Sequence, residues 1–410
     1  MVFDLVVIGG GPAGLFGAIR AKELNPRLSV IIMEKMDQCG RKLLVSGGGQ
    51  CNLTRDEENR ELIKGYGIQG RFLGTAFSAR SPSDTYEWFT AHGLPLIVRE
   101  DKKVFPASLR ATDVRDLLVG LCEKLHIEIR YQTPVSSIKR IGEATFQIEA
   151  ALGQEILSRN ILLATGGMNC PGTGSSGDGY ALAKSLGHVI VPPHPALAAA
   201  KATNEILSAV EGVSLERVCV IAQDGRWTGP LLFTRNGVSG PVILDNSRNL
   251  RSGDSIRLCT VFRPDGKPMP AEIFSQILMQ DAKRSPLKQI ATMLHQLAGV
   301  PKRLVQYHLK TLGIPEDKRC ADISNKQAAA LAERFCAWRM SLSFEGAFKT
   351  CMATAGGVAL SEIDSKTMMS KLVDGLYFAG EVIDIDGKCG GYNLQAAWST
   401  ADLVARAISL

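Results

Sequence analysis

The sequence has no two cysteines in a C-x-x-C arrangement, although it contains 10 cysteines in 410 residues. Zinc ribbons and thioredoxin-type dithiols need such spacings, so we interpret the cysteines as reduced thiols and expect no metal site. The sequence also lacks a basic leader and any apolar run near the roughly 20 residues that span a bilayer. We therefore expect a soluble, cytoplasmic protein without a membrane partner.

A strong charge of one sign is missing as well. The chain has 47 basic and 41 acidic residues, a formal charge of +6, which is mild for this length and makes nucleic acid an unlikely main partner. Residues 282–315 do hold a basic run without an acid, and its members are Lys283, Arg284, Lys288, Lys302, Arg303 and Lys310. A solvated helix surface explains this run best, and a face for an anionic partner is the alternative.

What the sequence does contain is a complete opening βαβ pattern in residues 3–34. The turn between strand and helix reads Gly9-x-Gly11-x-x-Gly14, and Glu34 closes the second strand. In this context the glycines predict a dinucleotide site: Gly9 for the tight turn, Gly11 for close approach of the pyrophosphate, and Gly14 for helix–strand packing. Glu34 would accept hydrogen bonds from the ribose hydroxyls.

The rest of the chain predicts a mixed α/β fold. Helices are expected within 81–93 and 111–126, a parallel strand at 127–131, and an antiparallel excursion over 135–164 that returns to the main sheet. Short β-like runs follow over 205–262. From 270 to 339 the pattern is helical, with starts expected at Ser285-Pro286, Val300-Pro301 and Ser324. The last stretch predicts a strand, a glycine loop and a closing helix.

These patterns predict a Rossmann-like domain that is interrupted by two insertions. The stretch PPHPALAAA, residues 192–200, is interpreted as a linker or domain edge. We expect the nucleotide-binding domain to comprise residues 1–192 and 345–410. A β-rich domain would comprise 193–268 with 335–344, and a helical domain 269–334.

The choice between NAD and FAD depends on three further glycine-containing stretches. They are SGGGQCN at 46–52, ATGG at 164–167, and FAGE at 378–381 followed by GGYNLQ at 390–395. NAD needs little beyond the first unit, whereas FAD needs additional backbone contacts along its ribityl chain and ring system, so the multiplicity favours FAD. A helix starting after Gly391 would direct its positive end at the reduced flavin.

The sequence excludes a nucleotide-triphosphate loop and gives no sign of a separate nicotinamide-binding domain. A nucleotide-triphosphate loop needs Lys-Ser/Thr after its glycines, but Gln50-Cys51 follows Gly49. A second G-x-G-x-x-G after a strand is missing from residues 190–345, so no dedicated nicotinamide domain is expected. NAD(P)H would then bind only transiently, as a reductant.

The chain resembles the BaiN-like family of bacterial flavoproteins, variously described as NAD(P)/FAD-dependent oxidoreductases, aminoacetone oxidases or bile-acid reductases. The matching stretches are GGGPAG, GRKLLVSGGGQCNLT, ATGGMNCPGTGSSGDGYALAKSLGH, GPLLFTRNGVSGPVIL and TMMSKLVDGLYFAGEVIDIDGKCGGYNLQAAWST. They extend over the whole chain. Two positions depart from the family, which usually has Arg at the place of Gln50 and a Ser-Gly pair at the place of Ser399-Thr400.

The resemblance implies FAD contacts at specific positions. These are Gly9, Gly11, Pro12, Ala13, Gly14, Glu34, Lys35, Lys42, Ser46, Gly47, Gly48, Gly49, Gln50, Cys51, Asn52, Val135, Ala164, Thr165, Gly166, Gly380, Glu381, Gly391, Tyr392, Asn393 and Leu394. Because Gln50 lacks the charge of Arg, FAD affinity or redox potential would differ from that of relatives.

Proton transfer to a substrate needs a titratable group near the flavin, and Tyr392 and Glu381 are the predicted catalytic residues. Asp384 and Asp386 are further candidates, although both are more simply explained as solvated loop residues. Cys51 is more simply a small buried residue than a redox centre, because Cys39 lies too far from it along the chain for a flavin disulfide reductase.

The sequence therefore predicts an FAD-dependent oxidoreductase that acts on a small-molecule substrate. The flavin would be reduced by NAD(P)H or by substrate and reoxidised by an organic acceptor, such as an enone C=C bond, or by oxygen. An aminoacetone-type amine oxidase that releases peroxide, a flavoprotein that binds or modifies RNA, and a flavin-binding protein without turnover are the alternatives.

Overall fold

The computed structural model describes residues 2–142 and 144–409, and the chain divides into two compact units. The first unit runs to Ala196 and resumes at Phe348, and the second comprises Leu197–Ala347. Within the described ranges, no helix is both long and apolar enough to cross a membrane. The domain limits expected from composition stay predictions.

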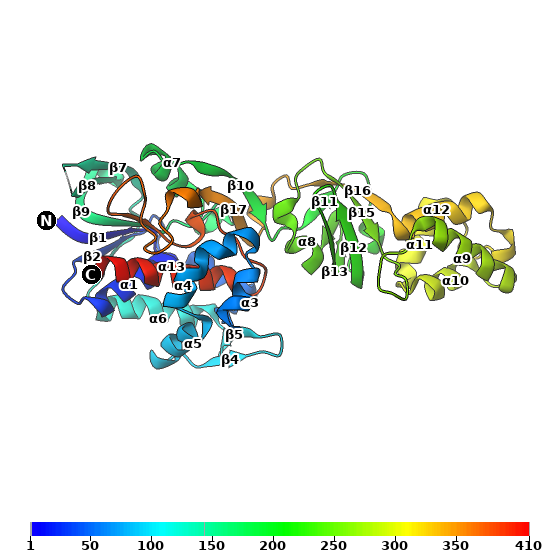
Figure 1. Ribbon diagram of the computed structural model, residues 1–410, viewed down its shortest axis with the longest axis horizontal. Helices are drawn as coiled ribbons and strands as arrows, with labels where there is room; N and C mark the ends of the chain where they lie inside the picture. Colours follow the sequence, from blue (N-terminus) through cyan, green and yellow to red (C-terminus); the bar gives the residue numbers. More distant parts are fainter. Residues whose placement is uncertain (1, 143, 410) are drawn as a thin grey trace. The chain divides into compact units, whose positions relative to one another are not determined.

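The first unit contains a seven-stranded sheet in the order β6-β2-β1-β9-β8-β7, with β18 pairing with β9 (Figure 1). The strands of this unit are β1 (Val2–Ile8), β2 (Val30–Met33), β3 (Thr54–Arg55), β4 (Leu96–Val98), β5 (Lys103–Pro106), β6 (Glu128–Arg130), β7 (Val135–Ile141), β8 (Thr145–Ala150), β9 (Gln154–Leu163), β10 (Ile190–Ala196), β17 (Ala353–Val358) and β18 (Leu376–Phe378). Its helices are α1 (Pro12–Leu24), α2 (Arg41–Val45), α3 (Asn59–Lys64), α4 (Gly74–Ala79), α5 (Pro82–Ala91), α6 (Ala111–Lys124), α7 (Asp178–Ser185) and α13 (Tyr392–Ser409).

The core of the sheet is parallel. β1 lies between β2 and β9, and β6 and β18 add parallel neighbours on either side. The inner strands are apolar along their length, as in VIIM of β2, because both of their faces are covered. β7 and β8 form the expected antiparallel excursion, and β18 rejoins the sheet more than 200 residues after β9. The Rossmann-like α/β fold is therefore confirmed.

The parallel arrangement collects the predicted motifs at one edge. Gly9 follows β1, Glu34 follows β2, Ala164 follows β9 and Gly380 comes two residues after β18. In open α/β sheets ligands bind outside the carboxyl ends of the strands. Segments that are widely separated in sequence thus meet where a nucleotide is expected.

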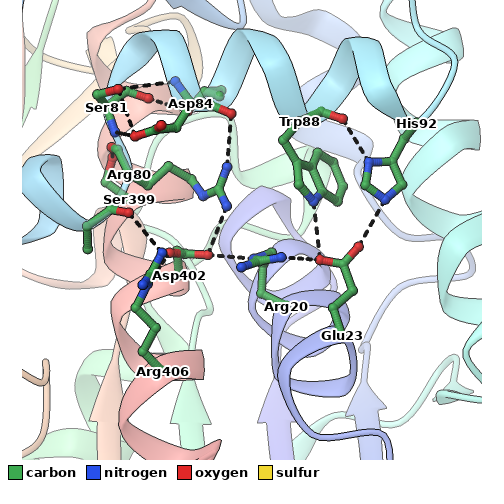
Figure 2. A network of polar contacts seen from close by, with 12 residues as sticks. Arg20, Glu23, Arg80, Ser81, Asp84, Trp88, His92, Ser399, Asp402 and Arg406 are labelled. Carbon is green, nitrogen blue, oxygen red and sulfur yellow. Dashed lines mark hydrogen bonds and ion pairs between the residues drawn. The ribbon is translucent and has the colours of Figure 1, made fainter.

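The long helix α13 packs side by side with α1 (Figure 1). Asp402 of α13 is fully buried and accepts hydrogen bonds from three arginines, as Figure 2 shows. Arg20 Nε donates to Oδ1 over 2.6 Å, Arg80 Nη2 donates to Oδ1 over 3.1 Å, and Arg406 Nε donates to Oδ2 over 2.8 Å. This network joins α13 to α1 and to the residues before α5.

The second unit contains a closed six-stranded barrel and a group of helices. The barrel order is β11-β14-β13-β12-β15-β16, with bounds β11 (Ala200–Ala202), β12 (Ser214–Ala222), β13 (Gly225–Thr234), β14 (Gly237–Ser239), β15 (Ser255–Cys259) and β16 (Trp338–Ser343). The helices are α8 (Pro241–Leu244), α9 (Ala271–Arg284), α10 (Ile290–Ala298), α11 (Lys302–Thr311) and α12 (Asn325–Cys336).

Three expectations from the sequence need correction. The expected helix start at Ser285-Pro286 is wrong: Ser285 follows the last residue of α9, and α10 begins only at Ile290, because the chain first runs beside residues 318–321. Residues 192–196, expected as a linker or domain edge, are not a linker but belong to β10, which pairs with β17 and ends where the first unit ends, at Ala196. The helical pattern also ends before residue 339, since Trp338 begins β16. The starts at Lys302 and after Ser324 are confirmed, the latter with a complete capping box.

Candidate cofactor and active site

The first glycine turn has the geometry that the motif predicts. Gly9 has φ +106°, and a Cβ on Gly14 would lie 1.9 Å from the Gly9 carbonyl oxygen. Only glycine fits these two positions, which bring helix and strand together. A Cβ on Gly11, in contrast, would meet no atom nearer than 4.0 Å, so this backbone faces open space. Pro12 begins α1 and Ala13 is buried beside it.

Glu34, the acid after β2, hydrogen-bonds to the backbone of the first glycine turn. Glu34 Oε2 accepts from the Gly10 N–H and Oε1 from the Met36 N–H, each over 2.8 Å. A carboxylate can accept further hydrogen bonds, so these contacts leave room for the predicted ribose interaction. Lys35 points instead to Asp178 at the start of α7, 2.5 Å away.

The loop of residues 46–52 explains the three consecutive glycines. Gly47, Gly48 and Gly49 have φ values of +56°, +67° and +85°, a left-handed run that costs other residues energy. Cys51 adopts φ +57° despite its side chain, so the loop carries backbone strain, which is concentrated at functional sites in proteins. The Cys51 thiol is fully buried, and burial raises its pKa to about 12, which opposes a thiolate redox role.

The amide of Asn52 ties this loop to the start of α13. Oriented to satisfy its neighbours, its nitrogen donates to Thr54 O over 2.9 Å and to Val104 O over 3.2 Å, while its oxygen accepts from Gly391 N over 3.2 Å. Two of the predicted stretches, SGGGQCN and GGYNLQ, are therefore in direct contact.

A lysine–glutamate pair lies at the turn after β9. Lys42 Nζ contacts Glu381 Oε2 and also donates to Asn169 Oδ1 over 2.9 Å and Ser175 Oγ over 3.0 Å. The remaining Glu381 oxygen, Oε1, accepts from Thr354 N over 2.7 Å. Gly166 faces this group, since a Cβ there would lie 3.4 Å from Lys42 Nζ.

Gly380 brings the C-terminal segment against α1. Its φ is +72°, a Cβ on it would lie 2.9 Å from the Ala13 Cβ, and its N–H donates to Thr400 Oγ1 over 3.0 Å. Thr400, one of the two departures from the family, thus has a structural partner. A small cavity lies here, and its lining residues are Gly380, Glu381, Ile383, Ile385, Asn393, Ala396 and Thr400.

The N-terminus of α13 is fixed by its own loop. Asn393 Oδ1 accepts from Gly387 N over 2.8 Å, and its Nδ2 donates to Gly387 O over 3.2 Å. Gly391 has φ +98° and lies so close to Thr54 that a Cβ would be 2.6 Å from its carbonyl oxygen. Leu394 follows in the first turn. The helix carries 18 residues, so its positive end is a substantial fixed dipole.

The Tyr392 side chain is engaged in contacts within the protein. Its hydroxyl lies 3.2 Å from Glu57 Oε2, the Arg55 guanidinium lies 5.1 Å above its ring, and a Cβ on Gly65 would be 2.2 Å from its Cε1. Burial raises the pKa of Glu57, but hydrogen bonds from Arg55 and Tyr392 outweigh it, and the pKa lies below its ordinary value. The catalytic assignments of Tyr392 and Glu381 stay predictions.

Val135 follows a segment that contacts the end of β2. The residues before it cross the end of β2, because Thr133 N donates to Glu34 O over 2.9 Å. Val135 itself begins β7 and pairs with Ala150 of β8. The site residues that we did not predict are Asn169, Ser175, Tyr180 and Thr354. The first three fall in the stretch ATGGMNCPGTGSSGDGYALAKSLGH, so a signal for them was present in the sequence.

The residues present fit a bound FAD. Besides the open backbone at Gly11, the hydroxyl oxygens of Thr165 and Tyr180 are buried without a hydrogen-bond partner among the described residues. Buried polar atoms are satisfied in nearly all folded proteins, so such orphans indicate a missing polar ligand or water. Thr165 comes two residues after the end of β9. Tyr180 of α7 lies near enough to Glu381 and Asp384 that burial and then their charges raise the pKa of its hydroxyl.

Comparisons with known proteins show the family to which the chain belongs. Residues 3–407 match the model of the HI0933-like protein Rossmann domain. The chain is 31% identical to a ribosomal RNA dihydrouridine synthase of Haemophilus influenzae and 30% identical to one of Escherichia coli, over 98% of each chain. It is 29% identical to a 3-dehydro-bile acid delta(4,6)-reductase of Clostridium scindens, again over 98% of both chains.

Solved structures resemble the chain in fold. A 3-ketosteroid-delta4-(5alpha)-dehydrogenase of Rhodococcus jostii matches with TM-score 0.50 and 14% identity, covering 100% of this chain and 97% of that one. A 3-ketosteroid delta1-dehydrogenase of Sterolibacterium denitrificans matches with TM-score 0.52 and 13% identity, covering 100% and 99%. The protein is an FAD-dependent oxidoreductase with a BaiN-like relative. By its match from end to end, the chain belongs to the HI0933-like Rossmann-domain family.

Proposed function

We propose that this protein reduces a carbon–carbon double bond that is conjugated with a carbonyl group, using FAD that NAD(P)H has reduced. The observation that carries the proposal is the set of relatives at 29–31% identity over 98% of the chain. A delta(4,6)-reductase and a dihydrouridine synthase, as named, both saturate such a bond. The steroid C=C of the one and the uracil C5=C6 of the other belong to one class of acceptor.

The chain's own residues would divide the work as follows. The turn from Gly9 to Gly14 and the N-terminus of α1 would bind the diphosphate, because free N–H groups and a positive helix end favour anions. Glu34 would hold the ribose. The N-terminus of α13 would lie at the flavin pyrimidine and stabilise negative charge there.

When bound, FAD supplies hydride transfer, so the double bond gains a hydride at one carbon and a proton at the carbon beside the carbonyl. The proton would come from Tyr392 or from water. The Lys42–Glu381 pair would orient the cofactor, since both partners are already fixed by Asn169, Ser175 and Thr354.

A steroid-like enone is the small-molecule substrate of this class, as in the name of the third relative. A uracil ring within ribosomal RNA is the second candidate, and the names of the first two relatives favour it. An RNA substrate would contact the exposed residues Lys302 and Arg303 on α11, since cations bind phosphates. Reversal of both charges would then abolish salt-sensitive retention of ribosomal RNA.

The test starts with the visible spectrum of the purified protein. We expect a yellow, FAD-containing protein that NADH or NADPH bleaches without oxygen. A 3-keto-4-ene steroid and deproteinised ribosomal RNA are then added separately, and reoxidation and the saturated product are measured. Aminoacetone, offered as a reductant instead, tests the amine-oxidase alternative.

A protein that cannot take up FAD would overturn the proposal. Bleaching by aminoacetone with peroxide release on exposure to air, and by no nicotinamide, would replace it with the oxidase alternative. A yellow protein that no donor bleaches would favour a flavin-binding protein without turnover.

A further inference from the structure

One cation beside the glycine loop differs from its neighbours. The short sheet β3-β5-β4 carries Arg55 and Lys103, and each pairs with a carboxylate over 2.6 Å, Glu57 and Asp101 respectively. Arg99, at the turn between β4 and β5, contacts only uncharged groups among the described residues. Its charge is therefore not neutralised by an ion pair.

The Arg99 side chain is nevertheless held in place. Its Nη2 donates to Gln50 Oε1 over 2.6 Å, and its guanidinium lies 3.9 Å from the centre of the Phe105 ring. Phe105 is itself buried, and its Cε1 lies 3.4 Å from where a Gly47 Cβ would be. The aromatic ring thus forms a platform between Arg99 and the glycine loop.

The backbone fixes the base of this side chain as well. Arg99 N donates to Lys103 O over 2.9 Å, and Lys102 N donates to Arg99 O over 2.8 Å. Lys102, in the turn between β4 and β5, has φ +63°, a left-handed conformation that a lysine seldom adopts. The β4–β5 hairpin is consequently tight, and it places the Arg99 side chain beside Gln50.

A guanidinium has five N–H donors in a planar fork, and Gln50 occupies one of them. Arg99 is exposed, so its remaining donors are available to a ligand from solvent. Planar guanidinium groups that are already ordered bind carboxylates and phosphates through two parallel hydrogen bonds. The neutral partners leave the full charge available for such an oxyanion.

We propose that Arg99 binds an oxyanion, a carboxylate or a phosphate, that the substrate carries apart from its reacting double bond. Arg99 is then a substrate-binding residue on the rim of the site, and Gln50 and Phe105 are the residues that position it. This inference rests on the proposed function, because it takes the glycine loop to be part of the active site.

The experiment measures binding without turnover, with the oxidised, FAD-loaded protein. One titration compares a 3-keto-4-ene steroid bearing a side-chain carboxylate with its methyl ester. A second compares a short uridine-containing oligonucleotide with uridine. We expect one of the two anionic ligands to bind about tenfold more tightly than its uncharged analogue, as for a charge-assisted hydrogen bond. In Arg99→Gln that ratio should fall to near one.

Arg159→Gln is the matched control, because Arg159 is exposed and pairs with Asp4 at the amino end of β1, opposite the glycine turn. It should keep the wild-type ratio. Loss confined to the steroid identifies a carboxylate, and loss confined to the oligonucleotide identifies a phosphate. An unchanged ratio in Arg99→Gln, or a wild-type protein without preference for either anion, overturns the proposal. Failure of the proposed function would show in turnover alone, with this binding preference intact.

Discussion

Replacement of Asp402 by Asn should destabilise the first unit severely. The carboxylate is fully buried, and removal of its charge leaves the cations of Arg20 and Arg80 without their common partner. Breaking a buried ion pair by removing one member costs about 3–5 kcal/mol. The asparagine keeps one acceptor oxygen, and Arg406 can turn to solvent, so we expect a value near the lower end, about 3 kcal/mol.

The assay is equilibrium unfolding in urea and by heat, followed by circular dichroism on FAD-loaded protein. A loss of this size should lower the thermal midpoint by roughly 6–12 °C for a unit of this length. Burial raises the pKa of Asp402, but Arg80, Arg406 and Arg20 outweigh it and the pKa is lowered. The stabilisation is therefore present above the ordinary carboxyl pKa and lost as pH falls through the lower, folded value.

The matched control is Asp37→Asn, the same chemical change at an exposed carboxylate that pairs with Arg41 over 3.0 Å. Surface pairs contribute about 0–1 kcal/mol, so its midpoint should stay close to wild type. If Asp402→Asn is as stable as this control, the buried arginines have found other partners and our reasoning about the network is refuted.

Three other perturbations have definite outcomes. Gly14→Ala places a methyl group 1.9 Å from the Gly9 carbonyl oxygen and should give colourless or insoluble protein, which a visible spectrum detects. Lys42→Gln removes the cation that contacts Glu381, Asn169 and Ser175; FAD retention on desalting should fall, and retention equal to wild type would contradict this role. His188 is buried beside Glu362, and burial lowers its pKa despite that contact. Because the unfolded chain then binds a proton at His188 more readily than the folded chain, the protein should lose stability as pH falls below about 6.5. Glutamine does not titrate, so the thermal midpoint of His188→Gln should fall less between about pH 7.5 and pH 5 than that of wild type.

Much of the fold follows from local sequence. The order of strand, glycine turn, helix and strand over residues 3–34 was predictable, because apolar periodicity and backbone freedom at Gly9 and Gly14 are local properties. The helix after Ser324 was predictable for the same reason, since a capping box is read from adjacent residues. The nature of PPHPA was not, because the order of β10 comes from β17, more than 150 residues away.

The candidate site also has features that follow from local sequence and features that depend on contacts between distant segments. The sequence by itself determined the residue types that a flavin site needs, including glycines where φ is positive and an acid after β2. Only the tertiary structure decided which side chains meet: Lys42 with Glu381, Asn52 with Gly391, and Arg99 with Gln50. Each of these contacts joins segments 49 to 339 residues apart, and such pairs depend on how the sheet and hairpins fold together. Gln50 shows the consequence most clearly, because a position without charge in the sequence has a guanidinium beside it in space.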